Sequence, residues 1–128
     1  MLPKVDFCGL QISRLIVGAN PFGGYSHQSK SRDAEMIAFH TIEQIHETWH
    51  RAEEAGLNAM ITNNETPRVM RAVSEYFACG GHLQWIAQVN NRTKPEMASS
   101  VKEVVDIGCK GLYFHGGKVD RLYADQDE

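Results

Sequence analysis

Residues 57–89, LNAMITNNETPRVMRAVSEYFACGGHLQWIAQV, decide the fold class of this 128-residue chain. The stretch begins with a short apolar strand pattern over residues 57–62 and ends with a second one over residues 83–89. Between them, Thr66 followed by a proline is typical of a helix N-terminus, and a glycine pair stops the helix predicted over residues 67–79. A strand, a helix and a strand in this order predict two parallel strands joined by a crossover helix.

Further strand and helix patterns flank this unit on both sides. Residues 4–13 fit a small N-terminal hairpin, and residues 15–17 predict a short strand that is buried on both faces. A capping box at Thr41 and Gln44 opens a helix that ends at Gly56. A later helix ends at Gly108, and a further strand is predicted over Gly111–Phe114.

These patterns together predict an α/β fold in a single domain over residues 1–128. About four parallel strands and three helices are expected, preceded by the hairpin. Such alternation is typical of a (β/α)8 TIM barrel, which needs about 250 residues to close. The sequence therefore predicts a partial TIM barrel, that is, a half-barrel. The segment from Asn20 to His40 is expected to be a long loop with a short helix in its second half.

Composition narrows the classes of protein to consider. With 42% hydrophobic and 23% charged residues, the chain has the composition of a folded domain rather than of a disordered one. The net charge is -3 and the 13 Lys and Arg residues are scattered, so we expect no nucleic-acid partner. No apolar run approaches the roughly 20 residues of a membrane span, so a cytoplasmic protein without a membrane partner is expected. Cys8, Cys79 and Cys109 are widely spaced, which favours neither a disulfide framework nor a zinc site.

The segment GLQISRLIVGANPFGG, residues 9–24, resembles the opening of the aldo-keto reductase family. That family shows a short hairpin, a Gly-x-x-Val/Ile-Ser-Arg-Leu run, a strand and a loop that ends in Phe-Gly. The later stretches AEEAGLNAMIT and LYFHGGKVD resemble the family's helix-glycine-strand junction and the strand that ends in its catalytic histidine. The resemblance implies the N-terminal half of a TIM-barrel oxidoreductase that uses NADP(H). The matching positions in the first segment are Gly9, Ser13, Arg14, Leu15, Gly18, Phe22 and Gly23.

Of the four residues that the family uses for catalysis, the resemblance carries over only His115. The aspartate position holds Ile61, the tyrosine position holds Thr66, and the lysine position falls on Gln88 or Val89. Without a phenol to protonate a carbonyl oxygen, hydride transfer lacks its general acid. The resemblance therefore implies a chain that is not competent as a reductase alone, and it leaves open whether the chain is an enzyme. NADP(H) is expected only where a second half-barrel is supplied, so no cofactor is expected for this chain by itself.

The candidate site is expected at the carboxyl ends of the strands, where parallel barrels place their chemistry. The side chains that follow the strands are rich in amides, which both donate and accept hydrogen bonds and so suit small carbonyl or sugar-like ligands. We expect His115 to be the catalytic residue, because it ends an apolar strand and two glycines keep its surroundings open. The residues expected to bind substrate are Asn20, Phe22, Tyr25, His27, Asn63 and Gln88, with Asn64, Glu65, Asn90 and Asn91 at the same strand ends.

Some of these residues have a structural alternative. Asparagines favour turns at strand ends, which would explain Asn63, Asn64, Asn90 and Asn91 without a ligand. Glu65 is either a general base or a residue that interacts favourably with the dipole of the next helix.

The sequence HETWH, residues 46–50, matches the HExxH zinc motif, but its place on the helix argues against a metal site. At about 100° per residue, the apolar stripe of this helix runs through Ile42, Ile45 and Trp49. His46 and His50 fall to one side of that stripe and are expected on a solvated flank. We therefore predict no metal ligands.

Two functions from different classes follow. The first is an aldo-keto-reductase-like barrel segment that presents a small-molecule site, with His115 polarising or protonating a ligand oxygen. The second is a non-catalytic or truncated half-barrel that binds ligand only on assembly. Because an open half-barrel leaves sheet edges and apolar side chains uncovered, both predict self-association or pairing with a missing half-barrel.

The departures at the reductase positions generate a first prediction. Titration of the chain with NADPH, followed by the fluorescence of the reduced nicotinamide, should show no saturable binding at micromolar concentration. The reason is that Ile61, Thr66 and Gln88 replace the polar residues which the family places around the cofactor's reacting end. Saturable micromolar binding would contradict this expectation.

Overall fold

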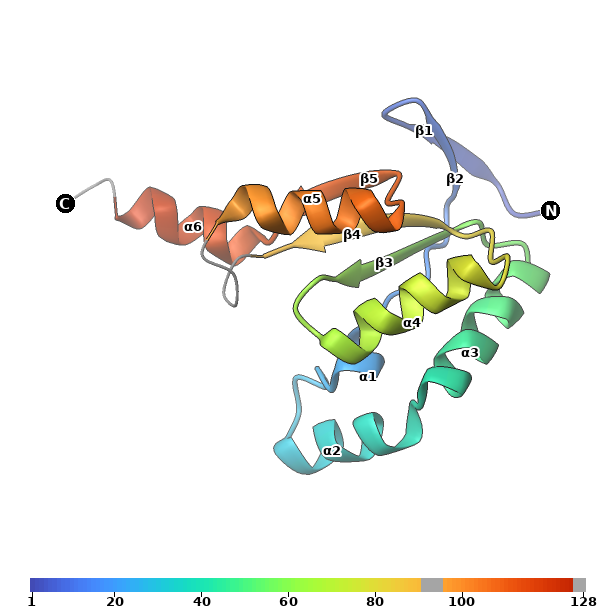
Figure 1. The fold of residues 1–128 in the computed structure, drawn as a ribbon, viewed down its shortest axis with the longest axis horizontal. Helices are drawn as coiled ribbons and strands as arrows, with labels where there is room; N and C mark the ends of the chain where they lie inside the picture. The colour runs from blue at the N-terminus through green and yellow to red at the C-terminus, as the bar shows by residue number, and fades with distance from the viewer. Residues whose placement is uncertain (91–95, 126–128) are drawn as a thin grey trace.

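The computed structural model describes residues 1–90 and 96–125 and shows a mixed α/β fold with two separate sheets (Figure 1). Strands β1 (Lys4–Phe7) and β2 (Leu10–Ser13) form an antiparallel hairpin. Strands β3 (Ala59–Asn63), β4 (Gln84–Val89) and β5 (Gly111–Phe114) form a parallel sheet with β4 in the middle. The helices are α1 (Asn20–Gly23), α2 (Lys30–Phe39), α3 (Ile42–Glu54), α4 (Pro67–Ala78), α5 (Met97–Ile107) and α6 (Gly116–Ala124).

The predicted partial TIM barrel with four parallel strands and three helices is wrong. In the described residues the parallel sheet has three strands, the second sheet is the two-stranded hairpin, and there are six helices. The strand expected over residues 15–17 makes a single bridge, from Val17 to Met60. The Ser13 hydroxyl donates to the Leu15 carbonyl at 2.6 Å, which removes an acceptor that a longer strand ladder would need.

Several local predictions are confirmed. The hairpin turns at Cys8 and Gly9, whose φ angles of 51° and 82° are those of a tight two-residue turn. The Thr41 hydroxyl accepts from the Gln44 N–H at 3.2 Å and caps α3. The helix expected in the second half of the segment from Asn20 to His40 is α2, whereas the loop expected in its first half begins with α1 instead.

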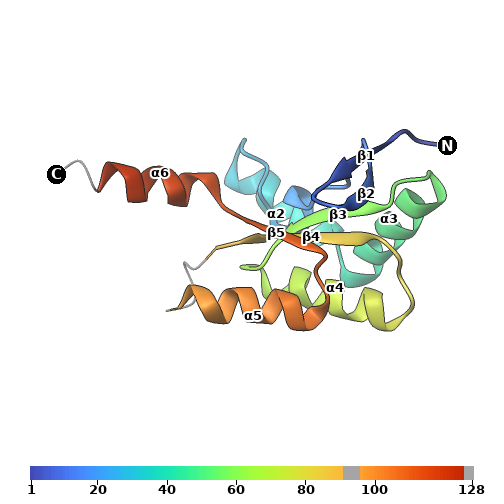
Figure 2. The same ribbon diagram turned by 90° about the horizontal axis from the view of Figure 1, so that it is seen from above.

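The parallel sheet has α4 and α5 against one face and the hairpin over the other (Figure 2). Alternation of side chains along the strands explains this arrangement. Met60 and Trp85 point toward the helices and belong to the larger hydrophobic cluster, whereas Ile61 and Ile86 join Ile12 of the hairpin in a smaller one. Helix α6 extends away from the sheet in both views, and none of its residues is buried.

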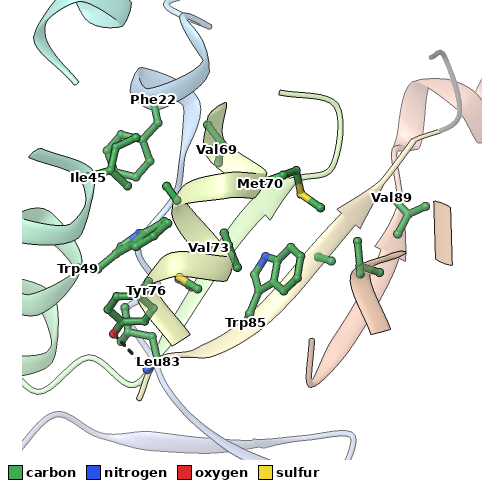
Figure 3. Close-up of a cluster of buried hydrophobic side chains, with 14 residues drawn as sticks. Phe22, Ile45, Trp49, Val69, Met70, Val73, Tyr76, Leu83, Trp85 and Val89 are labelled. Carbon is green, nitrogen blue, oxygen red and sulfur yellow. Dashed lines mark hydrogen bonds between the residues drawn. The ribbon is translucent and has the colours of Figure 1, made fainter. Parts of the chain in front are cut away.

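The larger cluster is built on aromatic side chains of α3, α4 and β4 (Figure 3). Trp49, Tyr76 and Trp85 are all fully buried. The rings of Trp49 and Tyr76 meet edge to face with centroids 5.1 Å apart, a contact that contributes about 1 kcal/mol beyond area burial. The Trp85 indole N–H donates to the Thr62 hydroxyl at 2.9 Å, so its polar atom is paired inside the core. These contacts fix α3, α4, β3 and β4 relative to one another.

The HETWH motif lies on α3 and takes part in this packing. His46 is half-buried, its Nε2 lies 2.8 Å from the Ala72 carbonyl oxygen of α4, and its ring stacks near Trp49. The expected solvated flank is therefore wrong for His46, because that side chain joins two helices. His50 is exposed and lies 3.5 Å from the Glu53 carboxylate. In the residues that the structure describes, no group of three or more His, Cys, Asp or Glu side chains is arranged to hold a metal ion.

Glu53 ties the end of α3 to α4 and to the turn before β4. One oxygen of its carboxylate accepts from the Tyr76 hydroxyl at 2.5 Å and from the His82 N–H at 2.6 Å. The Tyr76 hydroxyl in turn accepts from the Leu83 N–H at 3.3 Å. Burial alone would raise the pKa of Glu53, but the hydrogen bonds from Tyr76, His82 and His50 outweigh it and hold this pKa below its ordinary value. Burial and the bond to Glu53 raise the pKa of Tyr76.

The lowered pKa of Glu53 predicts how stability depends on pH. Its contribution is present above the ordinary value near 4.5 and is lost as pH falls through the lower folded value. At pH 7, Glu53→Gln should lower the free energy of unfolding by about 1–3 kcal/mol, because a charged acceptor is lost from paired donors. Chemical denaturation across the acid range should show this difference shrinking as pH falls.

Glu54→Gln removes the same charge from the neighbouring, exposed residue and serves as the control. It should change stability by less than about 0.5 kcal/mol. A difference between wild type and Glu53→Gln that stays constant down to the acid unfolding transition would contradict the role given to the carboxylate.

Candidate functional site

A row of polar side chains crosses the parallel sheet at the carboxyl ends of its strands. The strand register pairs Asn63 with Gln88 and Gln88 with Tyr113. Asn63 and Gln88 each lie two residues after an isoleucine that faces the hairpin, so the row stands on the face opposite α4 and α5. The Gln88 amide Nε2 donates to the Tyr113 hydroxyl at 3.0 Å. The row therefore forms a polar floor at one end of an otherwise apolar sheet.

Asn63 shapes the start of α4 as well as this floor. Its Oδ1 accepts from the backbone N–H groups of Glu65 at 2.9 Å and Thr66 at 3.2 Å. Thr66 occupies the N-cap position as expected, but its side chain makes no capping hydrogen bond, because Asn63 supplies the acceptor for this turn. The turn alternative for Asn63 is thus part of its role. With Oδ1 in use, its Nδ2 group is left to donate to a ligand.

A second wall comes from the segment between Val17 and α2. Asn20 Nδ2 lies 3.5 Å from His27 Nε2, which brings the two ends of this segment together. The Ser26 N–H donates to the Asp33 carboxylate at 2.8 Å and so ties the segment to α2. Hydrogen bonds with the side chain and the backbone of Ser26 hold the pKa of Asp33 below its ordinary value. His27 has a φ of 57°, a left-handed conformation that few residues other than glycine adopt.

His115 closes the site on the β5 side. Its backbone N–H donates to the Val89 carbonyl at 3.2 Å, and its ring Nδ1 accepts from the Gly117 N–H at 3.2 Å as the cap of α6. Because Nδ1 accepts, the neutral ring carries its proton on Nε2. That N–H is the hydrogen-bond donor which the neutral His115 ring has available.

These walls enclose a cavity of about 430 Å³, here called the main cavity. A hollow of about 450 Å³ adjoins it, shares Asn20, Asn63 and Gln88, and adds Tyr113. Both volumes lie in the range of small-molecule sites, about 300–1,000 Å³. The residues that line the main cavity are Asn20, Tyr25, His27, Asn63, Glu65, Gln88 and His115.

The structure brings most of the predicted site residues to this cavity, and Phe22 is the exception. Phe22 is 3% exposed and packs edge to face on Trp49, with ring centroids 5.9 Å apart, so it belongs to the core. Asn91 lies outside the described residues. Tyr113 was missed, although it stands two residues before His115 in a strand and therefore on the same face, a signal that the sequence contained.

Glu65 supplies the only carboxylate among the residues that line the main cavity. Its Oε2 accepts from the Asn90 side-chain amide at 3.2 Å. The buried Asn64 lies beside this pair, and its Oδ1 accepts from the Asn90 N–H at 3.0 Å. Glu65 is therefore turned toward β4 and the cavity, although its place before α4 also suits the helix dipole.

The chain matches no model of a known protein family, no curated protein and no solved structure. The resemblance to the aldo-keto reductases therefore remains a prediction from the sequence. The predicted cytoplasmic location and self-association also remain predictions. No helix in residues 1–90 and 96–125 is long and apolar enough to cross a membrane.

Arg68 of α4 holds the second wall in place. Its guanidinium donates through Nη1 to the Ile37 carbonyl at 2.8 Å and through Nη2 to the Phe22 carbonyl at 2.7 Å. One side chain thus joins α4 to both α1 and α2, the helices on either side of the residues that face the cavity. Hydrogen bonds from a charged donor are among the stronger ones in proteins.

Replacement of Arg68 should loosen the second wall without unfolding the sheet. Arg68→Met keeps the aliphatic stem and removes both donors, so amide hydrogen exchange in residues 20–39 should become at least about threefold faster at a cost of about 1–2 kcal/mol. Exchange in β3 and β4 should change little. Arg71→Met, one turn later on α4, removes a cation that pairs with Glu75 of the same helix and is the matched control. Equal effects of the two variants would contradict the role of Arg68.

Proposed function

We propose that this chain binds a small carbonyl or sugar-like compound in the main cavity, with His115 donating from Nε2 to a ligand oxygen. The observation that carries the proposal is the row of Asn63, Gln88 and Tyr113 across the strand ends. Asn63 and Gln88 each use one polar atom within the protein and keep another for a ligand, and the Tyr113 hydroxyl accepts one hydrogen bond and keeps its own proton to donate.

The hydrogen-bonding groups that remain match hydroxyl and carbonyl oxygens. In the described part of the chain, Asn63 keeps Nδ2 as a donor, and Gln88 keeps Oε1 as an acceptor. The Tyr113 hydroxyl accepts from Gln88 and can still donate its own proton. A hydroxylated ligand both donates and accepts, so it pairs with this mixture, whereas an apolar ligand would leave these groups unpaired at a cost of about 1–3 kcal/mol each.

The proposed role is binding with polarisation of a ligand oxygen, and hydride transfer is not part of it. Ile61 and Thr66 occupy the positions that would hold the acidic groups of a reductase, and neither side chain can protonate a carbonyl oxygen. In the described part of the chain, the titratable side chains that line the main cavity are Tyr25, His27, Glu65 and His115, and the neutral His115 ring acts as a hydrogen-bond donor rather than as an acid.

Calorimetric titration with glucose, xylitol and dihydroxyacetone tests the proposal. At least one of these compounds should bind saturably to the wild-type chain. Gln88→Leu removes the centre of the polar row, and His115→Ala removes the Nε2 donor, so each should weaken binding about tenfold. Gln88→Leu should cost little stability, since Gln88 belongs to no hydrophobic cluster, whereas His115→Ala also removes the cap of α6 and should cost about 0.5–2 kcal/mol.

Two matched variants control for changes elsewhere in the chain. Gln84→Leu makes the same substitution on the same strand and face, four residues earlier, where Gln84 donates to the Gln11 carbonyl. His82→Ala removes an exposed histidine from the turn before β4. Neither should change affinity. If no compound binds, or if Gln84→Leu weakens binding as much as Gln88→Leu, the proposed site is wrong.

A further inference from the structure

Resting on the proposed function, we infer that the ligand is an acidic polyol whose hydroxyl groups lie in the main cavity and whose anionic group lies in a smaller cavity beyond His115. The shared chemistry of the anionic group is a carboxylate or a phosphate attached to a hydroxylated carbon chain. The inference rests on the contents of the smaller cavity and on buried acceptors beside it.

The smaller cavity has a volume of about 110 Å³ and adjoins the main one. It is lined by Asn90, His115, Gly117, Lys118 and Arg121. His115 lines both cavities, so a ligand that contacts its ring can reach into either of them. The volume is that of a few water molecules at about 30 Å³ each, which is enough for one carboxylate or phosphate group but not for a second sugar ring.

The charge of the smaller cavity favours an anion. Lys118 and Arg121 lie one turn apart on α6, and among the described residues neither forms an ion pair. Other cations on the helices, such as Arg71 and Lys102, are paired with carboxylates on their own helix. The cavity also lies at the N-terminal end of α6, where the helix dipole adds positive potential.

Buried acceptors show that an anion alone would not satisfy this region. Asn90 is 3% exposed and lines the smaller cavity, and its Oδ1 has no hydrogen-bond partner in the described part of the chain. Glu65 Oε1, on the main-cavity side, is also buried and lacks a partner there. Both atoms accept hydrogen bonds, so they need donors, which a fully ionised carboxylate or phosphate group does not have. Hydroxyl groups next to the anion supply them.

Charge favours hydroxyl groups over an ammonium group as these donors. Lys118 and Arg121 line the smaller cavity and would repel an ammonium group, whereas a hydroxyl group donates without adding positive charge.

The carboxylate of Glu65 determines which end of the ligand lies in the main cavity. Glu65 repels an anion from the main cavity, while Lys118 and Arg121 attract it to the other side of His115. The anionic end therefore lies against α6, and the hydroxylated chain passes His115 toward Gln88 and Asn63.

Titration of the full chain with gluconate, glucose 6-phosphate and glucose tests this inference. Gluconate or glucose 6-phosphate should bind at least about tenfold more tightly than glucose, because charge-assisted hydrogen bonds are added. The tighter of the two acids assigns the anionic group as a carboxylate or a phosphate. The preference should fall as sodium chloride is raised from about 0.02 to 0.3 M, since salt screens exposed charges.

The double variant Lys118→Gln with Arg121→Gln should bind both acids no more tightly than glucose, while its affinity for glucose stays unchanged. The matched control is Arg51→Gln with Lys102→Gln, which removes two charges from exposed pairs on α3 and α5. This control should keep the preference for the acids. Circular dichroism should show that both double variants remain folded, because no residue of α6 is buried and because Arg51 and Lys102 are exposed.

The other outcomes separate this inference from the proposed function. If glucose binds as tightly as the acids, and Gln88→Leu weakens glucose binding, ligand binding in the main cavity is supported and the anionic subsite is wrong. If inorganic phosphate or acetate binds as tightly as the hydroxylated acids, the role of Asn90 and Glu65 is wrong. If the acids bind, and Lys118→Gln with Arg121→Gln weakens their binding whereas Gln88→Leu leaves it unchanged, the main cavity is wrong. If none of the compounds binds, both are overturned.

Discussion

The register of β4 between β3 and β5 is the constraint on which the candidate site depends. Trp85 and Val89 of β4 are held in the helix-facing core, and the Trp85 indole is bonded to Thr62 of β3. Because side chains alternate between the two faces of a strand, these positions fix Gln88 on the opposite face, beside Asn63. A slip of one residue would turn Gln88 into the core and Trp85 out of it, and core packing penalises such a slip heavily. The apolar face of the sheet thus determines where its polar end lies.

Several side chains at the site both stabilise the fold and line or support the main cavity. Asn63 caps the turn into α4 with its oxygen and faces the cavity, so the same side chain starts a helix and offers a donor. The Arg68 guanidinium donates to two backbone carbonyls and so holds the second wall in place. Three other side chains at the site differ, because each has a buried polar atom without a partner among the described residues: Asn64, Glu65 and Asn90. The indole N–H of Trp49 in the core is a fourth such atom, and native proteins usually pair buried polar atoms with protein groups, water or a ligand.

The sequence predicted the parallel unit and the polar strand ends because both follow from local rules. Strand periodicity and the meeting of carboxyl ends at one edge were enough to place Asn20, Asn63 and Gln88 together. The features that the sequence analysis predicted wrongly depend on contacts between residues distant in sequence. Phe22 follows a strand like a site residue, yet α1 carries it onto Trp49, a contact that no local pattern reveals. The barrel prediction failed because strand-helix alternation is common to barrels and open parallel sheets, and because the expected strand over residues 15–17 makes only one bridge, from Val17 to Met60.

The central claim is that the amide side chains which line the main cavity, Asn63 and Gln88 of the row and Asn20 of the second wall, bind one ligand as a unit. Nuclear magnetic resonance can follow the side-chain amide signals of Asn20, Asn63 and Gln88 in ¹⁵N-labelled protein while gluconate is added. The account predicts that all three signals shift together and give the same dissociation constant, and that the Gln84 side-chain signal, at the far end of the same strand, stays in place. Shifts confined to α2 or α6, or different dissociation constants for the three amides, would contradict it.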